Sequence, residues 1–196
     1  MLLRDYVFWK QGIPPHICDQ ILKYGTQLKS ESGKIGTATG TTKKDVRDSQ
    51  ISWVNAKWIW DWILDPVRRA NESIFKYNIN EVEDAQFTKY TAGQFYDWHV
   101  DIKEDEPDNI AKNYCRKLSI IIPLSDPSEY EGGNIEFRSL HCSPDGKYAP
   151  PLISKDEFKE KGTLLIFPSI IWHRVKPVTK GTRYSLVAWW GGPFFT

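Results

Sequence analysis

The spacing of apolar residues divides the chain into two parts of different character. Up to about residue 80 the pattern is helical, with apolar residues recurring every three or four positions after Pro14-Pro15. Asn55 and Asp65-Pro66 are each placed to begin a further helix, the last reaching about Tyr77. In between, residues 31–50 are polar and glycine-rich without an apolar period, which predicts a long loop. Because such loops in compact domains are often functional, residues 31–50 are a candidate lid.

Beyond residue 83 the pattern changes to short runs of β-branched and aromatic residues separated by turn signals. We expect strands at residues 86–90, 96–100, 118–124, 134–137, 163–167, 173–175 and 184–190. Many short strands predict a sandwich or barrel, and helices followed by strands predict an α+β protein that is mainly β. No repeat or linker divides the chain, so we expect residues 1–196 to form a single domain. Its helical part covers about 1–80 and its β core about 84–192.

Composition narrows the classes of function. The 196 residues are 40% hydrophobic and 26% charged, which is typical of a globular protein in water. No apolar stretch approaches the ~18 residues that a membrane span needs, so we expect no membrane partner. A formal net charge of +1 provides no electrostatic footprint for nucleic acid. Three cysteines without a CxxC pair, and a charged start without an apolar signal core, predict reduced thiols and a cytoplasmic location.

A His-x-Asp pair, His99 and Asp101, lies at the end of the strand expected at 96–100, and in an extended chain residues i and i+2 point to the same face. A second histidine would complete the two-histidine, one-carboxylate set that binds non-haem Fe(II) and leaves coordination positions open. His173, which follows an apolar run, is the candidate third ligand. Taken singly, the pair could be two polar residues of a surface strand, and His173 a hydrogen-bonded core residue. The same set could also hold zinc in a cupin-like enzyme.

Three further residues indicate a dicarboxylic cosubstrate. Arg183 follows the Lys180-Gly181 turn, and a hairpin would bring it beside His173. A guanidinium group binds a carboxylate through two parallel hydrogen bonds. Tyr90 and Tyr96 precede the His-x-Asp pair and offer neutral hydroxyl donors. Each residue has an ordinary alternative, a salt bridge for the arginine and core packing for the tyrosines, but their combination in this order favours a site.

Residues in this order resemble a known family, the prolyl 4-hydroxylase-type branch of the 2-oxoglutarate/Fe(II) dioxygenases. The segments that carry the resemblance are QFTKYTAGQFYDWHVD (86–101), EGGNIEF (131–137) and KGTLLIFPSIIWHRVKPVTKGTRYSLVAWW (161–190). The resemblance covers at least residues 84–192, and VRDSQISWV (46–54) resembles, with lower specificity, the Arg-x-Ser…Trp element of small members. It implies a double-stranded β-helix (jelly-roll) core with supporting N-terminal helices.

The resemblance also implies roles for individual residues. They are His99, Asp101 and His173 as Fe(II) ligands, Arg183, Tyr90, Ser185 and Tyr96 around 2-oxoglutarate, and Trp189 as an aromatic residue that closes the site. Arg47, Ser49 and Trp53 are candidates for substrate contact, with a solvated loop and a core tryptophan as the alternative. No catalytic acid or base beyond the metal centre is implied.

The reaction implied by the resemblance is hydroxylation of a C–H bond by O2, with decarboxylation of 2-oxoglutarate to succinate and CO2 and with ascorbate as reductant. The implied substrate is a prolyl or other residue of a peptide or protein; the alternative is a free amino acid or another small molecule. Repair-type nucleic-acid demethylases carry a second arginine where this chain has Trp189, which disfavours a nucleobase. Arg183 replaces the lysine of collagen-type enzymes and disfavours that subgroup. A non-catalytic jelly-roll binding module is the alternative of another class, although no ligand or arginine is missing.

Overall fold

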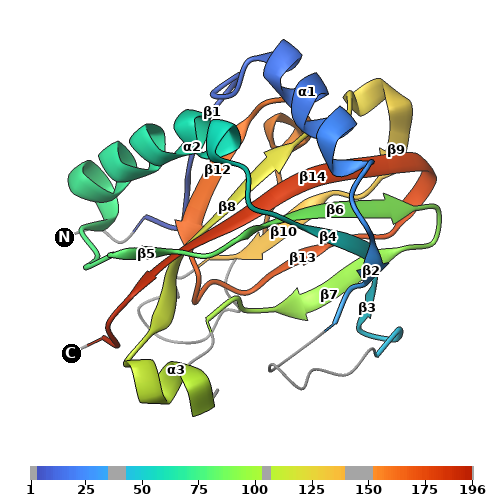
Figure 1. The fold of residues 1–196 in the computed structure, drawn as a ribbon. Coiled ribbons are helices and arrows are strands. Elements are labelled where there is room, and N and C mark those ends of the chain that lie inside the picture. Colours follow the sequence, from blue (N-terminus) through green and yellow to red (C-terminus); the bar gives the residue numbers. More distant parts are fainter. Residues whose placement is uncertain (1–3, 35–42, 103–106, 140–151, 196) are drawn as a thin grey trace.

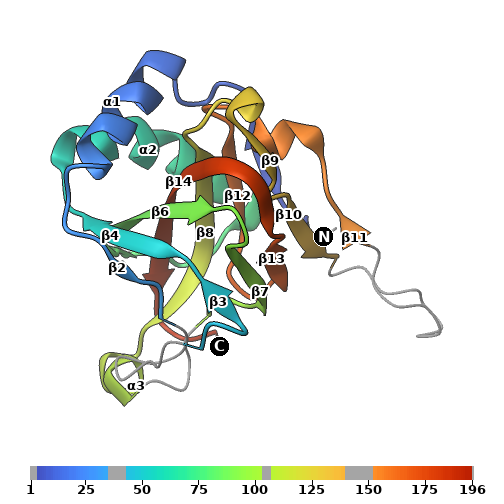
Figure 2. The same ribbon diagram turned by 90° about the vertical axis from the view of Figure 1, so that its right-hand side faces the viewer.

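The computed structural model describes residues 4–34, 43–102, 107–139 and 152–195. In this part of the chain the strands form two antiparallel sheets, of nine and five strands, and the chain crosses repeatedly between them. Figure 1 shows the long strand β14 crossing the larger sheet, and Figure 2 shows the smaller sheet lying against it. The expected α+β protein with a mainly β core is therefore confirmed.

The larger sheet consists, from one edge to the other, of β1 (Val7–Trp9), β12 (Leu164–Pro168), β8 (Cys115–Pro123), β14 (Val178–Gly192), β6 (Ala85–Thr91), β4 (Gln50–Val54) and β2 (Glu31–Ser32). Two short strands, β5 (Glu81–Val82) and β9 (Tyr130–Gly132), pair separately with β14. The smaller sheet consists of β11 (Leu152–Ile153), β10 (Ile135–Arg138), β13 (His173–Val175), β7 (Phe95–His99) and β3 (Arg47–Asp48).

Two helices cover the outer face of the larger sheet, α1 (Pro15–Gly25) and α2 (Lys57–Ala70) (Figure 1). The other helical segments are a π-helix at Asn71–Phe75, α3 at Pro107–Lys112, and short 3-10 turns at Pro127–Glu129 and Asp156–Lys159. Buried side chains at helical spacing on α2, among them Ile59, Ile63 and Val67, pack on this face of the sheet. In the described residues, no helix combines the length and the apolarity that crossing a membrane requires.

The two faces of the larger sheet have separate cores because side chains alternate along each strand. In β14, Leu186 and Trp190 belong to the core under the helices. Alternation therefore directs Arg183, Ser185 and Trp189 to the opposite face, which lies toward the smaller sheet, and all three are buried. A second apolar cluster fills this interior with side chains from both sheets. The strand period alone thus places three of the expected site residues in one compartment.

The N-terminal part is less helical than its apolar spacing suggests. Strand β1 pairs with β12, and β4 pairs with β6, so both join the larger sheet. The helix expected to begin at Asp65-Pro66 does not begin there, because α2 continues through Pro66 to Ala70. Because proline has no N–H, one carbonyl of the preceding turn lacks its helical hydrogen bond. Here that carbonyl belongs to Trp62, an exposed residue, so water can donate the hydrogen bond instead. Packing of the buried face of α2 then outweighs the local signal.

Two other local expectations are corrected. Asn55 does not cap α2; the residue at the cap is Ala56, and the Asn55 side chain instead donates to Asp84 at 2.8 Å. The expected loop 31–50 is ordered at both ends, where Glu31–Ser32 and Arg47–Asp48 are strands. The Gly33 amide donates to the Ser49 carbonyl at 2.9 Å and ties these ends together. Residues 35–42 lie outside the described residues, so the lid stays a prediction.

Candidate metal centre and cosubstrate pocket

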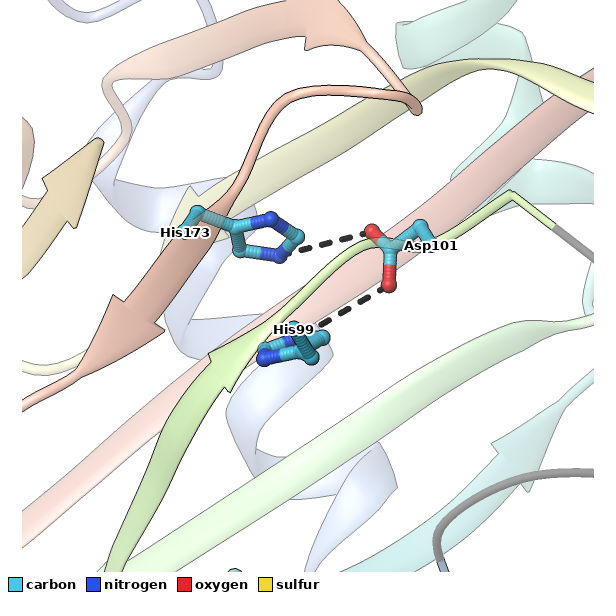
Figure 3. A group of neighbouring side chains, drawn as sticks. All are labelled: His99, Asp101 and His173. Carbon is cyan, nitrogen blue, oxygen red and sulfur yellow. Dashed lines mark ion pairs between the residues drawn. The ribbon is translucent and has the colours of Figure 1, made fainter. Parts of the chain in front are cut away.

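Two histidines and an aspartate converge at the edge where β7 meets β13. His99 ends β7, His173 begins β13, and the two residues are direct partners in the antiparallel ladder. Asp101 follows β7 rather than lying within it, and its backbone amide donates to the Ser169 carbonyl at 2.9 Å. Figure 3 shows the three side chains pointing toward one another. One ligand atom from each residue lies within 4.8 Å of the others.

The imidazole rings are held in the orientation that a metal ligand needs. The Nδ1 atom of His99 lies 2.7 Å from the Asp97 carbonyl oxygen, and that of His173 lies 3.0 Å from the Ile171 carbonyl oxygen. Because a carbonyl oxygen only accepts, Nδ1 carries the proton in both rings and the lone pair of Nε2 is available. The Nε2 atoms lie 3.7 Å (His99) and 3.5 Å (His173) from the Asp101 carboxylate oxygens.

The protonation states of the cluster also suit a cation. Burial, together with His173, lowers the pKa of His99 to about 3, so this imidazole is neutral. Burial alone would raise the pKa of Asp101, but His173, His99 and Arg116 hold it well below its usual range. Two imidazoles and one ionised carboxylate form a donor set that fits non-haem Fe(II) and leaves positions for other ligands.

A buried pair of serines supports the Asp101 carboxylate. The Ser119 hydroxyl, on β8, donates to Asp101 Oδ2 at 2.7 Å, and the hydroxyls of Ser119 and Ser169 are 2.9 Å apart. Neither serine is accessible to solvent. Sequence reasoning did not identify this pair. Its only signal is a polar residue, Ser119, interrupting the apolar run of β8.

A second cluster of polar groups lies deeper between the sheets, around Arg183. This residue is 2% exposed, and its Nη1 donates to the Ser185 hydroxyl at 3.1 Å. Its guanidinium carbon lies 5.6 Å from the centre of the Tyr90 ring. The Tyr130 hydroxyl is buried beside the Arg183 guanidinium group, which faces it, and makes no well-formed hydrogen bond among the described residues. Burial raises the pKa of Tyr90 and of Tyr130, so both remain neutral donors.

The route by which Arg183 reaches the interior differs from the expected hairpin. The strands β13 and β14 do not pair: β13 lies between β10 and β7, and β14 lies in the other sheet. Arg183 instead pairs with Tyr90 across β14 and β6. No Asp or Glu of the described chain forms an ion pair with it, and a buried guanidinium without a counter-ion fits a bound carboxylate.

Aromatic side chains line the same interior. The Tyr96 ring stacks on His99 with centroids 3.5 Å apart, and burial raises the pKa of Tyr96 to about 12. Trp189 is buried beneath Arg116, whose guanidinium carbon lies 3.8 Å from the ring centre. The buried Trp189 Nε1 makes no well-formed hydrogen bond among the described residues, but it is directed at the Asp101 carboxylate and contributes to the low pKa of that group. Trp53, which is 47% exposed, lies 6.4 Å from Trp189 between ring centres and marks the solvent side.

Comparison with known proteins agrees with this geometry. A sequence model of the 2OG-Fe(II) oxygenase superfamily matches residues 85–191. The chain belongs to this superfamily. A "PKHD-type hydroxylase" of Stutzerimonas stutzeri (strain A1501) is 30% identical over 103 residues, which make up 53% of this chain and 41% of that protein. The match therefore spans about two fifths of the relative's length.

Two solved structures of superfamily enzymes share the fold. A prolyl-4-hydroxylase from Pseudomonas putida superposes with a TM-score of 0.70 at 17% identity, over 95% of this chain and 91% of that one. A prolyl hydroxylase from Trichoplax adhaerens, in complex with a peptide fragment of the hypoxia inducible factor oxygen degradation domain, superposes with a TM-score of 0.72 at 17% identity, over 95% and 83%. The expected jelly-roll core of the prolyl 4-hydroxylase type is thereby confirmed.

Proposed function

We propose that this protein is an Fe(II)- and 2-oxoglutarate-dependent hydroxylase in which His99, Asp101 and His173 hold the iron. The observation that carries the proposal is the convergence of one ligand atom from each of two histidines and an aspartate within 4.8 Å in a chain of the 2OG-Fe(II) oxygenase superfamily. When bound, the metal and the cosubstrate supply activation of O2 and oxidation of a C–H bond, with succinate and CO2 as co-products. Ascorbate is the reductant that we expect to keep the metal ferrous.

Binding of 2-oxoglutarate is assigned to the cluster around Arg183. Its guanidinium group takes the far carboxylate of the cosubstrate, and Ser185 orients it from two residues along the same strand. The hydroxyl of Tyr130, buried without a well-formed hydrogen bond among the described residues, fits as a further donor, as does Tyr90. Tyr96, which stacks on His99, then forms one wall of this pocket.

The remaining work of the protein is positioning and exclusion of water. Carbonyl groups orient both imidazoles, and the serine pair orients Asp101, so no ligand has to be ordered when the metal arrives. Buried aromatic side chains limit access of water to the centre, which protects a reactive site from side reactions. No side chain has to act as a general acid or base, because the metal centre carries the oxidation.

The proposed substrate is a prolyl residue of a peptide or protein, supported by the fold shared with prolyl hydroxylases, one of them solved with a peptide. We place Arg47, Ser49, Trp53 and Trp189 on the substrate side of the centre. The first two come from the segment that leads into β4, and the two tryptophans lie near each other. A free amino acid is the alternative substrate.

The metal assignment is tested by spectroscopy without O2. Wild-type protein with Fe(II) and 2-oxoglutarate should develop the visible absorption band of a chelated keto acid. His173→Ala should lose this band, and His16→Ala, which changes an exposed histidine of α1, should retain it. A full band in His173→Ala, or no band in wild type, contradicts the proposed centre.

The reaction itself is tested by mass spectrometry. In air, with ascorbate, a panel of proline-containing peptides and free amino acids should include one product that gains a single oxygen atom, with one succinate formed for each product. Arg183→Gln should lose both products, and Arg69→Gln, an exposed arginine on α2, should not. If succinate forms but no compound of the panel gains an oxygen atom, the prolyl substrate is rejected and the assignment of 2-oxoglutarate as cosubstrate stands.

A further inference from the structure

A second buried guanidinium group, that of Arg47, lies beside the candidate metal centre and has no carboxylate partner among the described residues. Arg47 is 7% exposed, and its guanidinium carbon lies 4.4 Å from the centre of the Tyr96 ring, which itself stacks on His99. No Asp or Glu in the described part of the chain lies within ion-pair distance of it.

The orientation of Arg47 is set by hydrogen bonds that leave part of its donor capacity unused. Its Nε donates to the Ser49 hydroxyl at 2.9 Å and its Nη1 to the Lys34 carbonyl at 3.0 Å. A guanidinium group has five N–H donors in a rigid fork, and no described residue accepts from the remaining ones. Gly33 makes this position possible, because a Cβ there would come within 2.5 Å of Arg47 Nε. The fork is therefore held in place by its Nε side and presents its other N–H groups.

A buried cation usually has an anion beside it, because leaving it alone costs several kcal/mol. Arg116 follows this rule, since it forms a two-point pair with Glu83, with N–O distances of 2.6 and 2.5 Å. Arg183 departs from it and is assigned the far carboxylate of 2-oxoglutarate. Arg47 departs in the same way but belongs to the other sheet, where β3 pairs with β7, and its charge, like that of Arg183, acts on Tyr90. Because the far carboxylate of 2-oxoglutarate is assigned to Arg183, the anion for Arg47 has to come from a second ligand.

We propose that Arg47 is the receptor for a carboxylate of the substrate, so that the substrate class is a carboxylate-bearing molecule or peptide. This inference rests on the proposed function, because it assumes that the centre beside Tyr96 is where the substrate reacts. The two-point hydrogen bonding of a guanidinium fork with a carboxylate gives both the charge compensation that Arg47 lacks and a defined direction of approach to the metal. The carboxylate comes from a free amino acid, a chain terminus or an acidic side chain.

The test measures binding to protein already loaded with Mn(II) and 2-oxoglutarate, so that Arg183 is occupied and no turnover occurs. The probes are N-acetylproline and its neutral counterpart N-acetylprolinamide, followed by tryptophan fluorescence. We expect the acid to bind at least tenfold more tightly than the amide, and Arg47→Gln to remove this preference. Arg47→Lys, which keeps the charge but not the fork, should retain part of it.

Controls separate this idea from the proposed function and from misfolding. The Fe(II)–2-oxoglutarate absorption band should be the same in Arg47→Gln as in wild type, which also shows that the variant is folded. Equal binding of acid and amide by wild type overturns the carboxylate proposal even if the variants do not fold. A preference for the acid that survives in Arg47→Gln overturns the assignment to Arg47. Loss of the absorption band in folded Arg47→Gln, with the preference intact, would assign Arg47 to the cosubstrate instead.

If the acid binds with the expected preference, two further probes identify the source of the carboxylate. Free L-proline represents the amino acid, and a proline-containing peptide compared with its C-terminally amidated form represents the chain terminus. In a third outcome, the peptide with a free C-terminus and its amidated form bind equally well, and both lose affinity when acidic side chains are replaced by amides. That result would show that an acidic side chain of the substrate supplies the carboxylate.

Discussion

We expect loss of the hydrogen bond from Ser119 to Asp101 to destabilise the fold and to weaken metal binding. Ser119→Ala removes a donor 2.7 Å from a buried carboxylate oxygen and leaves Ser169, 2.9 Å from the lost hydroxyl, without this partner. A hydrogen bond to a charged group contributes about 1.5–3 kcal/mol. In the metal-free protein this loss should lower the unfolding temperature by roughly 3–12 °C, because each kcal/mol shifts it by about 2–4 °C in a chain of this size.

Metal binding should weaken as well, because Asp101 must then be ordered when the ion arrives. Loss of an outer partner of a metal ligand typically reduces affinity about 10- to 100-fold. Calorimetric titration of the metal-free variant with Mn(II), a redox-stable substitute for Fe(II), measures this change. Ser119→Thr retains the hydroxyl and should recover most of the affinity. Ser52→Ala, which changes a buried serine on β4, should leave it unchanged.

Either of two results would contradict the proposed role of the serine pair. If Ser119→Ala unfolds at the expected lower temperature but binds Mn(II) within twofold of wild type, the serine pair stabilises the fold and does not position the ligand. If neither quantity changes, water replaces the hydroxyl, and the assumption of a dry contact at Asp101 is wrong.

Three other predictions follow from particular contacts. Gly133 has φ +62°, and a Cβ there would lie 2.9 Å from Arg183 Cδ. Gly133→Ala should therefore weaken 2-oxoglutarate binding at least tenfold in an absorption titration. The control is Gly93→Ala, which changes a glycine at φ +87° with no atom within 4 Å and should not weaken binding. Ile63→Ala should lower the unfolding free energy by about 2–5 kcal/mol in urea titrations, because Ile63 is a wholly buried residue of α2 in the core between the helices and the larger sheet. The pKa of His99 is lowered to about 3, so below pH 6.5 the unfolded metal-free chain binds a proton that the folded chain does not. Its unfolding free energy should therefore fall by up to about 2 kcal/mol between pH 6.5 and 5, and an unchanged urea midpoint would contradict this.

Arg183 and Arg47 lie on different sheets beside the candidate metal centre. The buried Arg183 lies on the larger sheet, among polar groups that suit a dicarboxylic acid. Arg47 lies on the smaller sheet, at the far end from β11. Each sheet thus carries one guanidinium group without an acidic partner in the described residues. This agrees with a reaction in which Arg183 binds the cosubstrate and Arg47 binds the substrate at one metal centre.

The sequence by itself determined which residues could form the site and which of them share a strand face. Strand alternation is a local property, so Arg183, Ser185 and Trp189 had to point the same way once β14 was extended. The closeness of His99 and Asp101 is equally local. The order of these residues along the chain was also enough to indicate the family, which the match to residues 85–191 confirmed.

Contacts between distant segments were decided only by the tertiary structure. The pairing of His99 with His173 depends on the register of β7 and β13, and no local propensity determines which strands become neighbours. For the same reason the expected hairpin was wrong, although Arg183 still reached the interior from the other sheet. The support of Asp101 by Ser119 and the position of Arg47 over Tyr96 arise from strands brought together by folding, because burial and partnership are properties of the packed chain.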